Sequence, residues 1–378
     1  MIYLDHNATT PVLPEVLEAL LPFMRERFGN PSSIHWAGRM VKGALEEARE
    51  QVAGLVGCDG SELVFTSCGT EASNMAIKGV VSALRDRGRH IITTRVEHPA
   101  VTNTCLYLEK SGYDVTWLDV DERGLPSLEQ LESAITDQTV LISVMYANNE
   151  TGVVMPVREI GEIAARKRVY FHCDAVQAAG RIPVDLRKDG VTLLSLSGHK
   201  LYAPKGVGAL AVRKGTKMHP FIHGGSQERN RRAGTENLPG IVGFGKACEL
   251  AGASMAQESR RLAGLRDRLE EGILALIPHV RINGHGAERL PNTSNISIAD
   301  VDADTLLVNL DLAGIAVSSG SACSSGTLKA SPVLAAMGVP PAYARGSIRF
   351  SFGKENGDED MGRVLQILPE LVERLRKG

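Results

Sequence analysis

Short apolar runs alternate with helical patterns between Glu62 and Val212, and this alternation limits the possible folds more than any other feature of the sequence. Several runs are apolar throughout, as strands buried on both faces of a sheet are. The series comprises seven β-rich runs, at 63–66, 90–94, 115–118, 140–145, 169–173, 193–196 and 208–212. The pattern predicts an α/β fold with a mostly parallel seven-stranded sheet and helices on both faces.

A second, smaller α/β domain is predicted after this region. An amphipathic helix is expected at 257–277, directly after a stretch rich in glycine and alanine near 240–253. Two further strands and a closing helix are expected at 294–298, 347–352 and 361–376. We predict a large domain at residues 15–255 and a small domain made of residues 1–14 and 256–378.

Composition narrows the class of protein. The 378 residues are 43% hydrophobic and 23% charged, with a net charge of −2, as in an ordinary globular protein. This charge gives no reason to expect direct binding to nucleic acid or to an anionic membrane. The first residues lack the pattern of a signal peptide, and no apolar run reaches the length of a membrane span. We therefore expect a cytoplasmic protein.

The cysteines and histidines show no metal-ligand spacing. Six cysteines are dispersed along the chain without a CxxC pair, so we expect free thiols and no metal site. Cys105, Cys173 and Cys248 lie in apolar or helical contexts, which favours buried and unreactive side chains.

Polar residues follow several predicted strands, where ligands bind in sheets of this class. Asp174 and Lys200 follow two successive strands, and Gln177 lies one helical turn after Asp174. A lysine can hold pyridoxal 5′-phosphate (PLP) as a Schiff base, and a carboxylate can keep the pyridinium nitrogen protonated. Gln177 could donate to the phenolate oxygen. The alternative is a solvated surface lysine beside an ordinary aspartate, but the apolar run before Lys200 favours the cofactor site.

A phosphate site is predicted where the strand at 63–66 runs into a helix. Gly69 permits close approach of the backbone, Thr70 offers a hydroxyl, and the helix start provides free N–H groups. Ser197 and His199 flank Lys200 and can reach the same phosphate. Taken without Lys200, the segment is better explained as a capped helix start, and the presence of Lys200 reverses this preference.

Seven stretches of the chain together resemble the cysteine desulfurases of the NifS and IscS type. This family lies in the class V aminotransferase superfamily of fold-type I PLP enzymes, and the resemblance implies that fold. The stretches cover the chain almost from end to end and lie at 3–11, 65–71, 97–101, 148–152, 174–177 together with 195–200, 318–323 and 348–351.

The resemblance implies roles for individual residues. His98 would stack on the pyridine ring and assist proton transfer, and Asn149 and Arg349 would hold the α-carboxylate of the substrate. From the residues alone, Arg349 could also be a surface-facing arginine of an edge strand. The cofactor contacts that the resemblance implies are Gly69, Thr70, His98, Asn149, Asp174, Gln177, Ser197, His199, Lys200 and, from the partner subunit of a homodimer, Thr235.

Cys323 selects among the reactions that PLP permits. It lies in a run of small polar residues at 317–327, which predicts an exposed, mobile loop. A lone thiol in such a loop favours a nucleophile, although an incidental exposed cysteine is the alternative. No lysine, arginine or histidine stands beside it in the sequence, so its activation has to come from the folded site or the substrate.

These features predict a cysteine desulfurase that converts L-cysteine to L-alanine and leaves a persulfide on Cys323. Sulfur acceptors, such as an iron–sulfur scaffold or a carrier for tRNA thiolation, would be its partners. The rival hypotheses are a selenocysteine lyase or class V aminotransferase, and a sulfur-relay subunit without catalysis. Joint retention of Lys200, Asp174, His98 and Cys323 argues against the last of these.

The sequence departs from the family pattern at two places. Cys68 stands in the phosphate loop where the family commonly has glycine, so its backbone would have to do without the freedom of glycine. The sequence also ends at Gly378, soon after its last predicted helix, which favours the NifS type over IscS-type members with a longer tail.

Overall fold

A seven-stranded sheet forms the larger part of the computed structural model, which describes residues 1–319 and 331–377. Its strand order is β2-β8-β7-β6-β5-β3-β4, and within this sheet β8 alone runs antiparallel to its neighbours. The strands are β2 (Leu63–Thr66), β3 (His90–Thr94), β4 (Asp114–Leu118), β5 (Thr139–Ser143), β6 (Tyr170–Asp174), β7 (Leu193–Ser197) and β8 (Gly208–Val212). The predicted fold class and all seven strands are confirmed.

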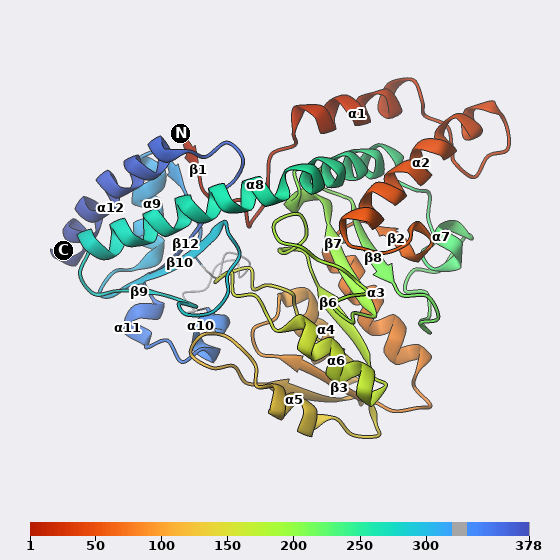
Figure 1. Cartoon of the computed structure of the whole chain (residues 1–378), viewed down its shortest axis with the longest axis horizontal. Helices are drawn as coiled ribbons and strands as arrows, with labels where there is room; N and C mark the ends of the chain where they lie inside the picture. The colour runs from red at the N-terminus through yellow and green to blue at the C-terminus, as the bar shows by residue number, and fades with distance from the viewer. Residues whose placement is uncertain (320–330, 378) are drawn as a thin grey trace.

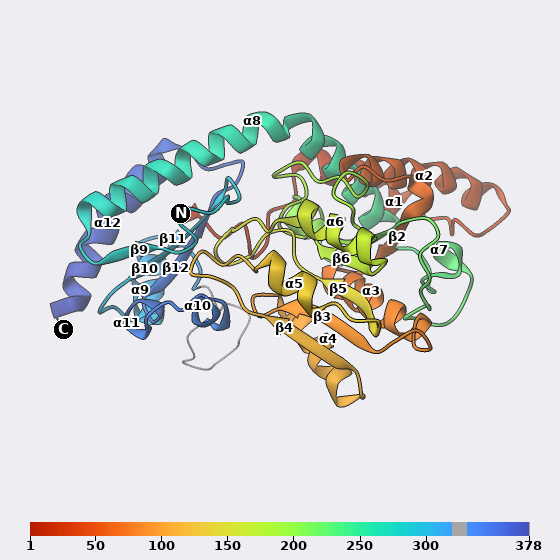
Figure 2. The same ribbon diagram turned by 60° about the horizontal axis from the view of Figure 1, so that its bottom comes forward.

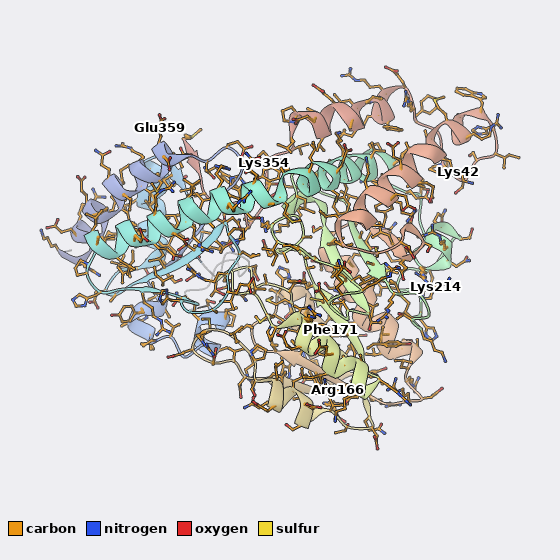
Figure 3. The ribbon with its side chains drawn as sticks, viewed as in Figure 1. Lys42, Arg166, Phe171, Lys214, Lys354 and Glu359 are labelled. Carbon is orange, nitrogen blue, oxygen red and sulfur yellow. The ribbon has the colours of Figure 1, made fainter. Side chains whose placement is uncertain are left out.

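Helices cover both faces of this sheet (Figures 1 and 2). Neighbouring residues of one strand point to opposite faces. Ile91 accordingly packs in the cluster that includes α3 and α4, and Ile92 in the cluster that includes α2, α6 and α8. These helices are α2 (Trp36–Leu55), α3 (Gly69–Ala83), α4 (Pro99–Lys110), α6 (Val157–Lys167) and α8 (Leu238–Leu276). Phe171 of β6, labelled in Figure 3, belongs to the same cluster as Ile92, and none of its surface is exposed.

The helix α8 is longer than the sequence predicts. It begins at Leu238, not near residue 257, and its 39 residues run along the molecule from the large sheet to α12 (Figure 1). Glycine lowers helix propensity, but packing can override it. A Cβ at Gly245 would lie 2.7 Å from the Cα of Ala48, so this glycine permits α2 and α8 to pack closely. Because α8 passes through residue 255 without a break, the division into domains at that point stays a prediction.

The small lobe is built on three antiparallel strands, β9 (Val280–Ile282), β10 (Thr293–Ile298) and β12 (Ser347–Ser351), which confirms the two strands predicted there. The short strand β1 (Ile2–Tyr3) pairs with β11 (Ile315–Ala316), so the N-terminus lies in this lobe (Figure 1). The closing helix α12 (Asp358–Lys377) is also as predicted. The remaining helices are α1 (Pro14–Arg25), η1 (Gly60–Glu62), α5 (Leu128–Ala134), η2 (Gly198–Lys200), α7 (Gln227–Asn230), α9 (Ala303–Leu312), α10 (Pro332–Ala336) and α11 (Pro341–Ala344).

A chain of buried polar side chains ties α3 to the sheet. Ser73 of α3 donates to Ser195 Oγ at 3.2 Å, and that atom lies 2.8 Å from His172 Nε2. The other ring nitrogen of His172 lies 2.9 Å from Ser143 Oγ. Buried polar groups need such partners, so this chain fixes α3 relative to three strands. Within residues 1–319 and 331–377, no helix is both long and apolar enough to cross a membrane.

Gly208 lets β8 approach the start of α3. A Cβ at this position would lie 2.7 Å from the carbonyl oxygen of Leu196 and 2.7 Å from the carbonyl carbon of Cys68. We predict that Gly208→Ala lowers the free energy of unfolding by about 1 to 3 kcal/mol, because backbone on both sides would have to move. Denaturant unfolding measures this change.

Gly43→Ala is the matched control for this prediction. Gly43 is an exposed residue of α2, and a Cβ there meets nothing within 4 Å. Alanine should therefore stabilise the protein by about 0.5 to 1 kcal/mol through helix propensity. If Gly208→Ala were as stable as Gly43→Ala, the close contact of β8 would be refuted.

Candidate active site

Asp174, Lys200 and His98 come together at the carboxyl ends of three strands. Asp174 ends β6, Lys200 lies in η2 directly after β7, and His98 follows β3 and caps α4. Burial raises the pKa of Asp174, while the charges of His98 and Lys200 act in the opposite direction. The three groups are therefore close enough to influence one another, as the prediction required.

His98 is a neutral imidazole at neutral pH. Burial lowers its pKa, the negative charge of Asp174 opposes that effect, and Lys200 lowers the pKa further. Its Nδ1 accepts a hydrogen bond from the backbone N–H of Ala100 at 3.1 Å. The proton of the neutral ring is therefore on Nε2.

Three of the predicted phosphate residues, Gly69, Thr70 and Ser197, lie at the start of α3. Gly69 is the first residue of this helix, and a Cβ there would lie 2.8 Å from Val176 Cγ2 and 3.3 Å from Ser197 Cβ. The hydroxyl of Ser197 is buried without a hydrogen-bond partner. Thr70 is exposed beside it. A helix start with free N–H groups and an unpaired hydroxyl fits an anionic phosphate.

Cys68 does not need the freedom of glycine. Its φ is −172°, an extended conformation that any residue adopts, and its Sγ accepts a hydrogen bond from the N–H of Glu71 at 3.5 Å. Cys68 therefore caps α3. Glu71 in turn pairs with Arg232 at 2.8 Å, which holds the segment that leads to the exposed residue Thr235.

Residues 5–10 form one wall of the site, which the sequence analysis did not anticipate. Lys200 Nζ donates to the carbonyl oxygens of Asn7, at 2.5 Å, and Ala8, at 2.7 Å. Gln177 Nε2 donates to the same oxygen of Asn7 at 3.0 Å. The stretch at 3–11, which carries part of the family resemblance, was the available signal, but we expected this segment only to pack with the small domain.

His199 faces the same segment. Its Nδ1 lies 3.1 Å from Thr9 Oγ1, and its carbonyl oxygen accepts from the backbone N–H of Thr10 at 3.0 Å. Burial, together with the charges of Lys200 and Lys205, lowers the pKa of His199 to about 4. The ring is therefore neutral at neutral pH.

Arg349 is buried, so the surface-facing alternative is wrong. Its side chain is 4% exposed, and its Nη2 pairs with Asp5 Oδ1 at 2.8 Å. Nη1 donates to the carbonyl oxygen of Asn149 at 2.9 Å, whereas Nε is buried without a partner. A guanidinium with an unsatisfied N–H suits a carboxylate ligand.

Cys323 lies outside the described residues, so its predicted position is not tested. The described residue Ser318 donates from its hydroxyl to Asp5 Oδ2 at 2.9 Å. Ser331 donates to Glu150 Oε2 at 2.5 Å. Before residue 320, the chain is thus hydrogen-bonded to Asp5, the ion-pair partner of Arg349. After residue 330, it is hydrogen-bonded to Glu150, the neighbour of Asn149.

The described residues fit PLP. The unpaired hydroxyl of Ser197 and the close approach at Gly69 suit its phosphate. The buried carboxyl of Asp174 suits a protonated ring nitrogen, and Lys200 lies within electrostatic reach of it. Across residues 1–319 and 331–377, no cluster of three or more His, Cys, Asp or Glu side chains could hold a metal ion.

Comparison with known proteins identifies the family. The model of the class V aminotransferase family matches residues 2–364, and the chain belongs to this family, whose members depend on PLP. A cysteine desulfurase IscS of Methanosarcina thermophila is 52% identical over 99% of this chain and 93% of its own length. A cysteine desulfurase IscS of Dictyoglomus turgidum is also 52% identical, over 99% of this chain and 95% of its own.

Solved structures agree with this assignment. A NifS-like protein superimposes with a TM-score of 0.93 at 40% identity and covers 99% of this chain and 100% of its own. A structure of SspA in complex with cysteine has a TM-score of 0.83 at 37% identity, covering 93% and 99%. The predicted resemblance to cysteine desulfurases of the NifS and IscS type, the enzyme class and the cofactor are confirmed.

Glu97 is a buried carboxyl beside this site that sequence reasoning missed. It is 6% exposed, and its Oε1 accepts from Thr94 Oγ1 at 2.8 Å and from the N–H of Met145 at 3.0 Å. Its Oε2 has no partner. Burial raises the pKa of Glu97 to about 8, with a further contribution from the charge of Asp174. The folded protein therefore holds this carboxyl protonated at neutral pH.

Glu97→Gln should change how stability depends on pH. In the unfolded chain this carboxyl loses its proton above about pH 4.5, but in the folded protein only near pH 8. Folding of the wild type is thus favoured at low pH, and this contribution, a few kcal/mol (~1.4 per pH unit), is lost as the pH rises through that window. Glutamine does not titrate, so the variant should gain stability relative to the wild type as pH rises.

Denaturant unfolding of the cofactor-free protein between about pH 5 and about pH 8 measures this difference. Glu159→Gln on the exposed face of α6 is the control, and it should follow the wild type. A constant difference between Glu97→Gln and the wild type at every pH would contradict the raised pKa.

Proposed function

We propose that this cysteine desulfurase converts L-cysteine to L-alanine and carries the sulfur as a persulfide on Cys323. The observation that carries the proposal is the buried Arg349, whose unpaired Nε–H lies in a site shared with Lys200, Asp174 and His98. The α-carboxylate of an amino acid offers the acceptor that this Nε–H lacks. The similarity to proteins named cysteine desulfurases supports cysteine as the substrate.

Each site residue would have its own role in the reaction. Arg349 and Asn149 would bind and orient the α-carboxylate, and Lys200 would take the proton from Cα. Bound PLP supplies a ring that accepts the electrons left on that carbon. The cofactor would be held by Asp174 and Gln177 at its ring and by Gly69, Thr70, Ser197 and His199 at its phosphate. His98 would stack on the ring and assist proton transfer.

Cys323 would take the sulfur. Its thiolate attacks the substrate Sγ, so a new S–S bond forms while the Cβ–Sγ bond breaks and its electron pair stays with carbon. Cβ then takes a proton, which yields L-alanine, and the sulfur remains on Cys323 as a persulfide. Cysteine and one thiol thus become alanine and one persulfide, so atoms and electrons balance without a further oxidant or reductant.

The persulfide has to be handed to a second molecule. We propose a sulfur-acceptor protein, such as an iron–sulfur scaffold or a thiolation carrier, as the partner of this enzyme in the cytoplasm. We also propose a homodimer in which Thr235 completes the phosphate site of the partner subunit. The exposure of Thr235 and the anchoring of its segment by the Arg232–Glu71 pair support this arrangement.

Replacement of Cys323 tests the chemistry. Cys323→Ala should still bind PLP, because no proposed cofactor contact changes, but should form almost no alanine from L-cysteine, because no thiolate takes the sulfur. Alanine is quantified by chromatography and PLP by visible absorption. Alanine formation near the wild-type rate would replace the persulfide mechanism with that of a lyase or aminotransferase.

Cys58→Ala is the matched thiol control. Cys58 is 9% exposed, and burial raises the pKa of its thiol to about 12, so it is not a nucleophile at neutral pH. This variant should therefore form alanine at close to the wild-type rate. Equal loss in both variants would point to general damage rather than to a role of Cys323.

Thr235 tests the dimer. Light scattering should give twice the mass of the chain, and Thr235→Ala should remain a dimer but bind PLP about tenfold more weakly, because one hydrogen bond to a charged group is lost. Equilibrium titration with PLP measures the affinity. A monomer with full PLP occupancy would refute the proposed dimer site.

A further inference from the structure

The carboxamide of Gln177 lies between a hydrogen-bond donor on one side and a hydrogen-bond acceptor on the other. Arg181 Nη1 donates to Gln177 Oε1 at 2.6 Å and also to the backbone oxygen of Gln177 at 2.8 Å. On the other side, Gln177 Nε2 donates to the carbonyl oxygen of Asn7 at 3.0 Å. Gln177 is only 5% exposed, so water does not compete freely for these positions.

These partners permit one orientation of the amide. A guanidinium has only donors, and a backbone carbonyl only accepts. If the amide rotated by half a turn, its NH2 group would face Arg181 and its oxygen would face the oxygen of Asn7. Both contacts would then be repulsive. The second N–H of Gln177 Nε2 is therefore presented on a defined side.

Arg181 is a cation that lacks a carboxylate partner. Its guanidinium donates to neutral oxygens, those of Gln177 and the carbonyl oxygen of His6 at 3.4 Å, and no ion pair includes it among residues 1–319 and 331–377. Burial lowers the pKa of Arg181 to about 10, so it remains charged at neutral pH. Arg181 is half-buried, and even partial burial of a charge without a counter-charge costs stability, which argues against a purely structural role.

The location of Arg181 relates it to the cofactor site. Arg181 and Lys200 both line a cavity of about 50 Å³, together with Tyr202. Lys200 and Gln177 also share the carbonyl oxygen of Asn7 as an acceptor. Arg181 thus hydrogen-bonds the residue proposed to contact the cofactor's phenolate oxygen. It donates no hydrogen bond to Ser197 or His199 on the phosphate side, although its charge contributes to the lowered pKa of His199.

We propose that Arg181 is a positioning residue that fixes the carboxamide of Gln177 and polarises it, so that its free N–H donates to the phenolate oxygen of bound PLP. The inference rests on the proposed role of Gln177. A guanidinium that donates to Oε1 draws electron density from the amide and strengthens the N–H as a donor. A phenolate is an acceptor only, so it requires this orientation.

The test is the pH midpoint at which the visible absorption of the bound cofactor changes. A cation and a strong donor both favour the more negative form of the cofactor, so they lower this midpoint. Arg181→Met should therefore raise the midpoint by about 0.5 to 1 pH unit, and Arg181→Lys, which keeps the charge and one donor, should fall between it and the wild type. If Arg181→Met does not fold, Arg181→Gln removes the same charge with a polar side chain.

A double-variant cycle shows whether Arg181 acts through Gln177. In a Gln177→Met background, Arg181→Met should shift the midpoint by less than half of its effect in the wild type. Arg158→Met removes a positive charge from the exposed face of α6 and should leave the midpoint unchanged. An unmoved midpoint in Arg181→Met, or an equal shift in both backgrounds, would overturn the inference.

Alanine formation by the wild type separates this inference from the proposed function. If the wild type forms no alanine from L-cysteine, the proposed function fails, but the midpoint still tests Arg181. If the wild type forms alanine and the midpoint does not depend on Arg181, only the inference fails.

Discussion

Every polar atom of Asn7 is hydrogen-bonded, although only 1% of this residue is exposed. Its backbone carbonyl oxygen accepts from Lys200 and Gln177 of the large lobe, and its backbone N–H donates to the hydroxyl of Ser351 in the small lobe. Its side chain bonds Asn149 on one side and Asn292 and Thr293 on the other. A buried polar group without a partner would cost stability. The hydrogen bonds of Asn7 therefore favour one arrangement of the two lobes around the site.

The site keeps charged and polar groups in places where water has little access to them. Arg349 has an unpaired buried Nε–H, Arg181 has only neutral partners, and the carboxyl of Glu97 is held protonated. Each arrangement costs stability in the protein alone. An anionic substrate supplies an acceptor for the Nε–H of Arg349, which already pairs with Asp5, and an anionic cofactor supplies a counter-charge near Arg181. The same arrangement therefore gives binding energy and selectivity for anionic ligands.

Local sequence patterns correctly predicted the features that depend on a residue's own helix or strand. Apolar runs predicted the seven strands, and the rule for ligands in α/β sheets placed Asp174 and Lys200 at the same edge. The predicted start of α8 was wrong, because glycines that weaken an isolated helix permit close contact with α2 in the folded protein. Asp5 was missed because its partner Arg349 lies far away in the sequence. Arg181 and Glu97 were missed because their roles depend on burial in the folded protein, which raises the pKa of Glu97 and lowers that of Arg181.

The sequence by itself determined the fold class, the family and the chemistry available, because strand periodicity and a distinctive set of reactive residues are local properties. The tertiary structure decided which groups carry charge and which atoms face the ligand. Burial sets the protonation of His98 and Glu97, and the two partners of Gln177 set the direction of its amide. Such effects depend on the removal of water and on contacts between distant segments, which no local pattern encodes.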